Sequence, residues 1–467
     1  MMRPISLARN SIRFVRPMLY SAHPHHQVTA KWLQRILEDD SEPPRLYAWT
    51  LVNLADGSGG GSGLSELGGR VDAGGERRRV YVLGVGNIGR LYAACLARNA
   101  ARPPITLVVN RRELLEYWRD QPGLEIVRND GTGVREGGFE VEWWTDVRPD
   151  FGPVREPGEG EGGGARIRSL IVATKAADAM PLVDRVRRYL GDESEVAFSQ
   201  NGMCKLWPPL GEIYARHRWG DAGRGPRWRA CVTTHGVTAL GPFRSLLASP
   251  ASVAVGTVGV GVRKEEGDTE YLVEQIIGAP GLAARRVGTR ELWVAQLEKL
   301  VVNSVINPLT AVLGCKNGEL FVDRGDGVGD VVDRLLGEAG RTLRELVKDE
   351  STDGVLLSRE GVEETSKSDE ARLKDMRTEL VERFSFSKLR TMLYDVGEKV
   401  AENTSSMLQD VRAGKKTEIE DFNGWLVETA RYLGDEDGLP AHEKLIALVM
   451  SGKTLSRDEL VRHFLGK

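Results

Sequence analysis

Residues 79–89 read RVYVLGVGNIG, and this stretch decides how the N-terminal half of the chain folds. The apolar run ending at Leu83 is typical of a buried strand, and a helical pattern follows over 90–98. In such a unit the first glycine allows a tight turn, the second lets the backbone approach a pyrophosphate, and the third lets the helix pack against the sheet. We therefore expect a dinucleotide-binding loop, with a fortuitous glycine turn as the alternative. The loop residues are Gly84, Val85, Gly86, Asn87, Ile88 and Gly89.

A second predicted strand, Ile105–Val109, leads into Asn110, Arg111 and Arg112. Enzymes that use NAD usually carry an acidic residue here, which binds the 2′-hydroxyl of the ribose. A neutral side chain followed by two guanidinium groups suits a 2′-phosphate instead, because the arginine fork matches phosphate oxygens. We therefore predict NADPH as the cofactor and Arg111 as one of its ligands. The alternative is a solvated arginine pair at the start of a helix.

Outward from this stretch, strand and helix patterns alternate over residues 78–288, which predicts a doubly wound α/β domain. Residues 152–165 are rich in Gly and Pro, and we expect a surface loop insertion between strands. The pattern is helical over 289–467, which predicts a second, all-α domain. Within that domain, residues 323–372 are highly charged with scattered apolar residues, and we expect them to form an insertion.

The first 37 residues contain no Asp or Glu but several arginines and serines, a composition typical of a mitochondrial transit peptide. We therefore predict a transit peptide over 1–37 and a mitochondrial matrix location. A disordered basic tail, and a cytoplasmic protein, is the alternative. Residues 38–77 include a Gly-rich run, which predicts a flexible linker, so that order would begin at Arg78.

The overall composition excludes several classes of protein. With 64 basic and 67 acidic residues in 467, the net charge is −3, which argues against a protein that coats nucleic acid. No uncharged apolar run reaches the roughly 18 residues that a membrane span needs. The four cysteines lie far apart and form no CxxC pair, so we expect neither a disulfide framework nor a metal site.

The most informative helical segment is 297–308, which carries Lys299, Asn303 and Asn307 among apolar neighbours. Their spacing of four residues places all three on one face of a helix. Buried polar side chains of this kind need partners. They can be satisfied by backbone groups, or they can line a cleft that binds a small polar acid; the spacing alone leaves both alternatives open.

Several ordered motifs together resemble the ketopantoate reductase (2-dehydropantoate 2-reductase) family. They cover roughly residues 78–320 and 375–467. In chain order they are the loop at Gly84–Gly89, Lys175 in Ala-Thr-Lys-Ala, Asn201 between Gln200 and Gly202, His235 between Thr234 and Gly236, the Lys299/Asn303/Asn307 helix, Asn317 in Asn-Gly-Glu-Leu, and Ser406 with Glu418 further on.

The resemblance implies a Rossmann (doubly wound) domain joined to an all-α domain of the 6-phosphogluconate-dehydrogenase-like type, with the active site in the cleft between them. It implies that Lys299 is the general acid. The implied substrate-binding residues are Asn303, Asn307, Asn317 and Ser406. The implied cofactor contacts are the glycine loop, Lys175, Asn201 and Glu418.

The chemistry is consistent with these residues. Hydride transfer to a ketone builds negative charge on its oxygen, which a protonated Lys299 can stabilise and then protonate. The leading hypothesis is NADPH-dependent reduction of ketopantoate to pantoate, for pantothenate and coenzyme A synthesis. Reduction of another branched 2-keto acid is the second. A non-catalytic mitochondrial factor associated with RNA or the ribosome, on the same fold, is the third. The partners we expect are a small 2-keto acid, no metal and no nucleic acid, with a homodimer left open.

Overall fold

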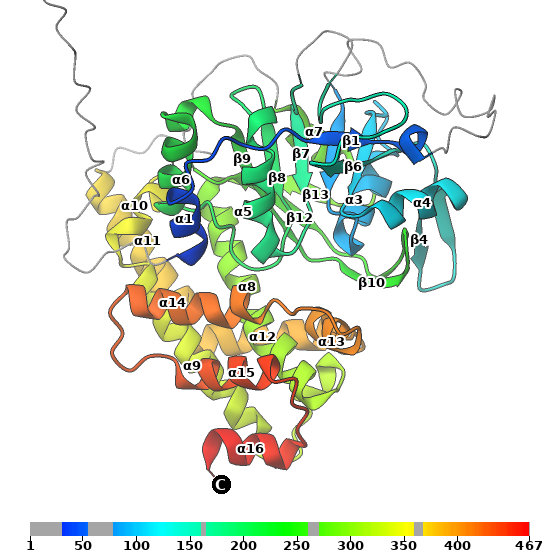
Figure 1. Ribbon diagram of the computed structural model, residues 1–467. Helices are drawn as coiled ribbons and strands as arrows, with labels where there is room; N and C mark the ends of the chain where they lie inside the picture. Colours follow the sequence, from blue (N-terminus) through cyan, green and yellow to red (C-terminus); the bar gives the residue numbers. More distant parts are fainter. Residues whose placement is uncertain (1–29, 55–77, 160–164, 260–269, 359–367, 467) are drawn as a thin grey trace, which may run out of the picture.

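A computed structural model describes residues 30–54, 78–159, 165–259, 270–358 and 368–466. Figure 1 shows an α/β domain above a bundle of helices, with the long helix α8 (Thr289–Leu313) running from one into the other. The fold class predicted from the sequence is therefore confirmed.

The α/β domain is built on a nine-stranded sheet. Its order is β1 (Tyr47–Trp49), β6 (Glu140–Thr145), β3 (Ile105–Val109), β2 (Val80–Leu83), β7 (Ser169–Val172), β8 (Glu195–Phe198), β9 (Arg227–Thr233), β12 (Val253–Thr257) and β13 (Ala284–Arg286). The six strands from β6 to β9 are parallel to one another, and the outer strands β1 and β12 pair antiparallel with β6 and β9. The chain leaves β2 for β3 on one side and later enters β7 on the other, so the strand order reverses at β2. Dinucleotides bind at such a reversal in open α/β sheets.

Helices flank this sheet and follow its strands. They are α3 (Asn87–Leu96), α4 (Arg112–Asp120), α5 (Ala176–Arg185), α6 (Leu210–Trp219) and α7 (Tyr271–Gly278). Strands β2, β3, β7 and β8 are buried along their whole lengths, as expected for parallel strands with helices on both faces.

A second, four-stranded sheet was not anticipated from the sequence. It joins the hairpin of β10 (Gly236–Gly241) and β11 (Arg244–Ser249) to the hairpin of β4 (Leu124–Arg128) and β5 (Gly133–Glu136). The two hairpins lie more than a hundred residues apart in the chain and meet through parallel pairing of β11 with β4. Such a non-local pairing leaves no short-range signal in the sequence.

The helical domain contains α8 and a further set of helices packed around it. These are α9 (Val328–Leu346), α10 (Asp353–Leu356), α11 (Asp369–Arg383), α12 (Phe386–Lys399), α13 (Ser406–Arg412), α14 (Trp425–Tyr432), α15 (Pro440–Met450) and α16 (Arg457–Leu465). Helix α8 ends at Gly314, whose left-handed φ of 67° suits glycine.

The prediction that residues 38–77 form a flexible linker was wrong for residues 38–54. Strand β1 adds to the edge of the main sheet through antiparallel pairing with β6, and a 3₁₀ turn, η1 (Leu51–Leu54), follows it. Leu46, Ala48 and Trp49 are buried in the domain core. The apolar residues from Leu46 onward form buried structure, although a Gly-rich segment follows them in the sequence. Residues 55–77 lie outside the described part of the chain.

The predicted transit peptide over 1–37 extends too far towards the C-terminus. Helix α1 (Lys31–Leu37) packs against α5 and α6, and Leu33 is completely buried there. Residues 30–54 thus form an N-terminal strap on the α/β domain, and they are part of its fold. Residues 1–29 lie outside the described residues.

The expectation that apolar residues are only scattered over 323–372 was also wrong, because α9 lies within this segment. Residues Val328, Val331, Leu335, Leu336 and Leu343 share one buried stripe along this helix, which packs against α8, α12, α14, α15 and α16. The charged residues occupy the opposite face, as in any amphipathic helix. Residues 359–367 lie outside the described ranges.

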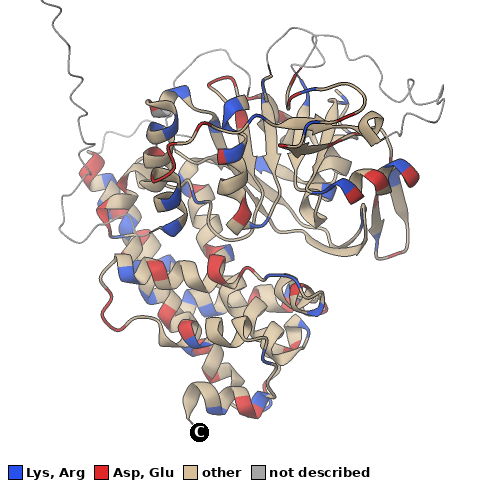
Figure 2. Cartoon of the chain, in the orientation of Figure 1, with Lys and Arg blue, Asp and Glu red and all other residues tan. Residues whose placement is uncertain are grey.

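Acidic and basic residues are interspersed along the chain of both domains in Figure 2. None of the helices in the described part of the chain combines the length and the apolar character that crossing a bilayer requires.

Candidate active site

The glycine loop between β2 and α3 has the geometry that its sequence predicts. Gly84 has a φ of 98°, and a Cβ there would lie 2.8 Å from Thr174. A Cβ at Gly89 would lie 2.0 Å from the carbonyl oxygen of Gly84, so only glycine lets α3 begin this close to the strand. By contrast, a Cβ at Gly86 would meet nothing within 4 Å. The first and third glycines are therefore required by packing, whereas the second leaves open space at the N-terminus of a helix, where a phosphate binds favourably.

The two arginines after β3 have different surroundings. Arg112 pairs with Glu116 at 2.9 Å and lies over the ring of Trp49, in the N-terminal strap, at 5.5 Å. Arg111 precedes α4 in extended backbone, is exposed, and has a loose ion pair of 3.9 Å with Glu113. Arg111 therefore has the more available guanidinium group for a ligand at the end of β3.

Lys299 lies at the junction of the two domains. From α8, its Nζ donates to the Oδ1 of Asn201, 2.9 Å away, and to the carbonyl oxygen of Thr233, 2.5 Å away. Both acceptors belong to the α/β domain and follow or end strands β8 and β9. Burial lowers the pKa of Lys299 to about 8, while the nearby charge of Glu418 acts in the opposite direction. The lysine is thus protonated at neutral pH and titrates close to it.

Asn201 connects Lys299 to Glu418. Its Oδ1 accepts from the lysine, and its Nδ2 donates to the Oε2 of Glu418 at 3.4 Å. Glu418 is buried, and its Oε1 also accepts from the backbone N–H of Ala176 at 3.4 Å. Burial raises the pKa of Glu418 to about 6, opposed by Lys175 and by the hydrogen bond from Asn201. The result is an ordered row of amine, carboxamide and carboxylate, with groups from both domains.

Lys175 follows β7 and reaches across to the helical domain. Its Nζ lies 2.6 Å from the Oδ2 of Asp410 in α13 and also donates to the carbonyl oxygen of Lys416. Asp410 and the carbonyl of Thr233 were not predicted from the sequence as members of this site. A backbone carbonyl cannot be predicted from the type of residue that carries it. Asp410 lies one helical turn after Ser406, and this spacing could have indicated from the sequence that the two share a helix face.

Three of the four predicted substrate-binding residues are asparagines. Only some of their side-chain donors and acceptors have hydrogen-bond partners among the described residues. Asn307 donates from Nδ2 to the Oγ of Ser406 at 3.3 Å, and that serine is otherwise exposed. Asn317 donates to the carbonyl oxygen of Val400, but its own buried Oδ1 has no partner among the described residues. The buried Nδ2 of Asn303 likewise has none in the described part of the chain. A buried polar atom without a partner costs about 1–3 kcal/mol, so a bound ligand would relieve that cost here.

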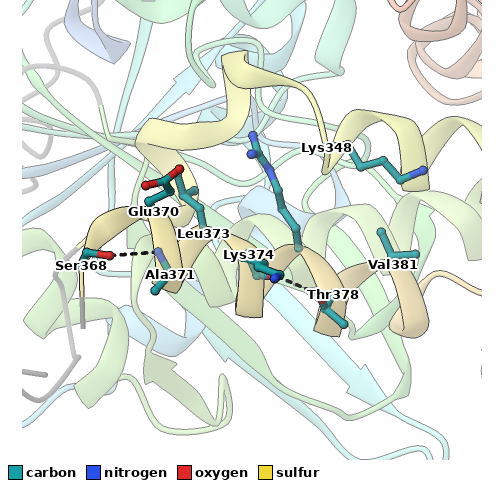
Figure 3. A pocket seen from close by; sticks show the side chains of 9 residues that line it. Lys348, Ser368, Glu370, Ala371, Leu373, Lys374, Thr378 and Val381 are labelled. Atoms are coloured by element: carbon teal, nitrogen blue, oxygen red, sulfur yellow. Dashed lines mark hydrogen bonds between the residues drawn. The ribbon is translucent and has the colours of Figure 1, made fainter. Parts of the chain in front are cut away.

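A surface hollow of about 750 Å³ lies elsewhere, beside α11. Figure 3 shows Lys348, Ser368, Glu370 and Lys374 among the side chains that line it. No residue of the sequence motifs contributes to this hollow. The chemical groups lie at the domain junction instead, so we place the active site there.

The junction offers a proton donor with a pKa close to neutral, a set of uncharged hydrogen-bonding side chains and, beside them, an open phosphate-binding loop. This combination suits the transfer of a hydride and a proton to a small polar substrate. Within the described residues, no three His, Cys, Asp or Glu side chains are grouped as they are around a metal ion.

Comparison with known proteins shows the family of the chain. The family model described as "Ketopantoate reductase PanE/ApbA" matches residues 80–259, and "Ketopantoate reductase PanE/ApbA C terminal" matches residues 291–452. Ketoisovalerate reductase BEA2 of Gibberella fujikuroi is 39% identical over 451 residues, which cover 93% of this chain and 98% of that protein. Ketoisovalerate reductase of Beauveria bassiana is 37% identical over 459 residues, with the same coverage of 93% and 98%.

Among solved structures, the ternary complex of D-mandelate dehydrogenase with NADH and anilino(oxo)acetate superposes with a TM-score of 0.54. It is 16% identical in sequence and covers 82% of this chain and 99% of its own. At that identity the likeness shows a shared fold.

Proposed function

This chain belongs to the ketopantoate reductase family of oxidoreductases, and we propose that it reduces 2-ketoisovalerate to the corresponding 2-hydroxy acid with NADPH. The observation that carries the proposal is the protonated Lys299 held at the domain junction, one helical turn before Asn303, whose buried Nδ2 has no partner among the described residues. The leading hypothesis from the sequence was ketopantoate. We place 2-ketoisovalerate first because two relatives of high coverage are named ketoisovalerate reductases.

Lys299 is the proposed general acid. The reduction leaves negative charge on the keto oxygen, and an ammonium group next to that oxygen stabilises the charge and supplies the proton. Its pKa of about 8 keeps the amine charged at pH 7 but makes the proton easier to release than from an ordinary lysine. Asn201 and the carbonyl of Thr233 hold the ammonium group in place.

The proposed substrate-binding residues are Asn303, Asn307, Asn317 and Ser406. The unpaired Nδ2 of Asn303 is a donor that a substrate carboxylate can accept from, and it lies one helical turn after Lys299 on α8. Asn307 and Ser406 bond each other and can turn towards a ligand at little cost. Uncharged donors of this kind bind a carboxylate without competing for the proton of the lysine.

The residues present fit a dinucleotide. The space at Gly86 and the N-terminus of α3 suit a pyrophosphate, and the exposed Arg111 suits a 2′-phosphate, which would favour NADPH over NADH. When bound, the nicotinamide ring supplies the hydride. Lys175, Asn201 and Glu418 are proposed to orient the cofactor, since all three meet where the α/β domain faces the helical domain.

Ketopantoate remains a second candidate because of Ser406. Ketopantoate carries a hydroxyl group that 2-ketoisovalerate lacks, and an exposed serine hydroxyl next to Asn307 can bond it. A site that depends on such a bond rejects the substrate without the hydroxyl by as much as about 10⁴-fold. A site without that bond accepts both substrates to within about 100-fold.

The test is the oxidation of NADPH by the purified protein with each of the two acids, measured as kcat/KM. A value for 2-ketoisovalerate above that for ketopantoate supports the proposal, and the reverse order favours ketopantoate. The absence of turnover with both acids and with other branched 2-keto acids would favour the non-catalytic alternative.

We propose, from the acid-free composition, that residues 1–29 direct the protein to mitochondria, and we retain the domain division at residues 288 and 289. The buried helix α1 restricts any cleavage to a site before Ala30, because later removal would expose the core around Leu33. Expression of a fluorescent fusion to residues 1–29, followed by microscopy, tests the targeting.

A further inference from the structure

Arg90 is a partly buried cation that the proposed mechanism does not use. It lies in the first turns of α3, directly after Gly89. Its Nε donates to the carbonyl oxygen of Val85, 2.9 Å away, and its Nη1 donates to the carbonyl oxygens of Gly241 and Arg244 at 2.7 and 2.9 Å. The Oγ of Ser245 lies 3.3 Å from the same nitrogen.

All of these partners are neutral. Among the residues that the structure describes, Arg90 forms no ion pair with an acidic side chain, and burial lowers its pKa to about 10. A charge removed from water without an opposite charge is costly. The fold therefore holds a guanidinium group in a position where an anion would stabilise it.

The location of Arg90 indicates which anion that is. Val85, to which its Nε is bonded, belongs to the glycine loop itself. Asn87 and Arg90 are three residues apart on α3 and share one face, and side chains of a helix lean towards its N-terminus. Asn87 donates to the carbonyl oxygen of Val237 and accepts from Ser245, so both residues contact the β10–β11 hairpin. The guanidinium group thus lies between this hairpin and the phosphate-binding loop.

We propose that Arg90 is a further cofactor-binding residue, whose guanidinium group supplies the opposite charge for the dinucleotide pyrophosphate and at the same time fixes the β10–β11 hairpin beside the loop. The inference rests on the proposed function, since it requires that a dinucleotide binds. It goes beyond the glycine-loop contacts, which are made by backbone N–H groups and carry no net charge.

The two parts of this role affect different measurements. Loss of the bonds to the hairpin lowers the melting temperature whether or not a ligand is present. Loss of the charge opposite the pyrophosphate weakens ligand binding and reduces the stabilisation that the ligand gives.

The experiment compares the unmodified full chain with Arg90→Met and Arg90→Lys. Methionine keeps much of the side-chain length without the charge, and lysine keeps the charge. Arg244→Met is the matched control, because Arg244 lies on the same hairpin but is exposed and paired with Glu125 at 2.9 Å. Calorimetry measures binding of NADPH, of 2′-phospho-ADP-ribose and of 2′,5′-ADP, which lacks the pyrophosphate. Thermal unfolding is recorded with and without NADPH.

We expect Arg90→Met to weaken NADPH and 2′-phospho-ADP-ribose by about tenfold or more, and 2′,5′-ADP by clearly less. Without ligand this variant should melt somewhat below the unmodified protein, because the bonds to the hairpin are lost, and the rise in its melting temperature on adding NADPH should be smaller. Arg90→Lys should keep most of the affinity, and it replaces the methionine variant if that variant does not fold.

Binding of NADPH by Arg90→Met within twofold of the control, with a lower melting temperature, would overturn the proposal and leave Arg90 as a structural link. So would equal weakening of all three ligands. If the unmodified protein binds NADPH but Arg90 has no effect, only this inference fails. If the unmodified protein binds no dinucleotide, the proposed function fails with it.

Discussion

The glycine loop and the junction around Lys299 represent two ways of building a site. The loop is contiguous: residues 84–89 meet because they are neighbours in the chain, and each glycine has a separate geometric reason. The junction is assembled: Asn201, Lys299 and Glu418 come from three distant segments and two domains. The first site therefore depends on backbone shape, whereas the second depends on how the domains meet.

The largest effect is expected at the junction. Replacing Lys299 by alanine removes the charge and the proton donor, each worth roughly 10²–10³-fold, so turnover should fall by at least about 100-fold. NADPH affinity, measured by fluorescence titration, should change little because the phosphate-binding loop is unaltered. Glu298→Gln is the control, since this neighbour on α8 pairs with Arg383 at the surface. A Lys299→Ala variant that keeps a tenth of the turnover would exclude Lys299 as the general acid.

At the loop, two glycines should respond differently to the same added methyl group. Gly89→Ala places a Cβ 2.0 Å from the oxygen of Gly84, so α3 must shift. We expect a loss of about 1–3 kcal/mol of stability from this overpacking, and at least tenfold weaker NADPH binding. Gly86→Ala has open space around its Cβ and should melt at the same temperature as the unmodified protein, while still weakening NADPH. Equal melting temperatures for both variants would contradict this distinction between packing and binding.

The end of β3 should show a smaller effect, on cofactor choice. Arg111→Ala should reduce the preference for NADPH over NADH by about tenfold, because one charged hydrogen bond to phosphate is lost. Arg112→Ala should change the preference less than about twofold, because its guanidinium group is already engaged by Glu116 and Trp49. Dissociation constants for the two cofactors measure both variants. The opposite ranking of the two arginines would refute the assignment of Arg111.

The pH dependence should show both titrating groups of the junction. The pKa of Lys299 is lowered to about 8, and the reduction needs its protonated form, so kcat/KM should fall above pH 8 by about tenfold per unit. The pKa of Glu418 is raised to about 6, so a second decline is expected below pH 6 as this carboxylate is protonated.

Above pH 8 the free energy of unfolding should not decline together with kcat/KM. Between pH 8 and 10.5 the unfolded chain binds more protons at this lysine than the folded chain, so the contribution of Lys299 to stability rises with pH. Thermal unfolding over the same range separates loss of activity from loss of fold. A rate that stays constant to pH 10 would mean that Lys299 is not the titrating acid.

The parts of the fold that the sequence predicted well depend on local patterns. The strand of Ile105–Val109 is found with the same ends, and the doubly wound α/β domain was predicted from the alternation of strands and helices. Two misread segments show the limit of composition as a guide. Charged residues concealed the buried stripe of α9, and the glycines after residue 56 concealed the short strand before them.

For the candidate active site, residue types and contiguous geometry could be predicted from the sequence alone. It placed Lys299, Asn303 and Asn307 on one face of a helix, and three glycines where a turn, a ligand and a helix need them. It left open whether that helical face is satisfied by the backbone or lines a site.

The tertiary structure supplied the partners of that face: Asn201 and the carbonyl of Thr233 reach Lys299 through strand order and domain contact, whereas the buried Nδ2 of Asn303 has no partner among the described residues. Of the two arginines after β3, it is Arg112 whose guanidinium group lies over Trp49, a residue of the N-terminal strap some sixty positions earlier in the chain. The periodicity of a sequence shows only which face of its own helix or strand a residue occupies. Burial, charge and hydrogen bonding between distant segments shift pKa values and fix orientations, and these exist only once the chain has folded.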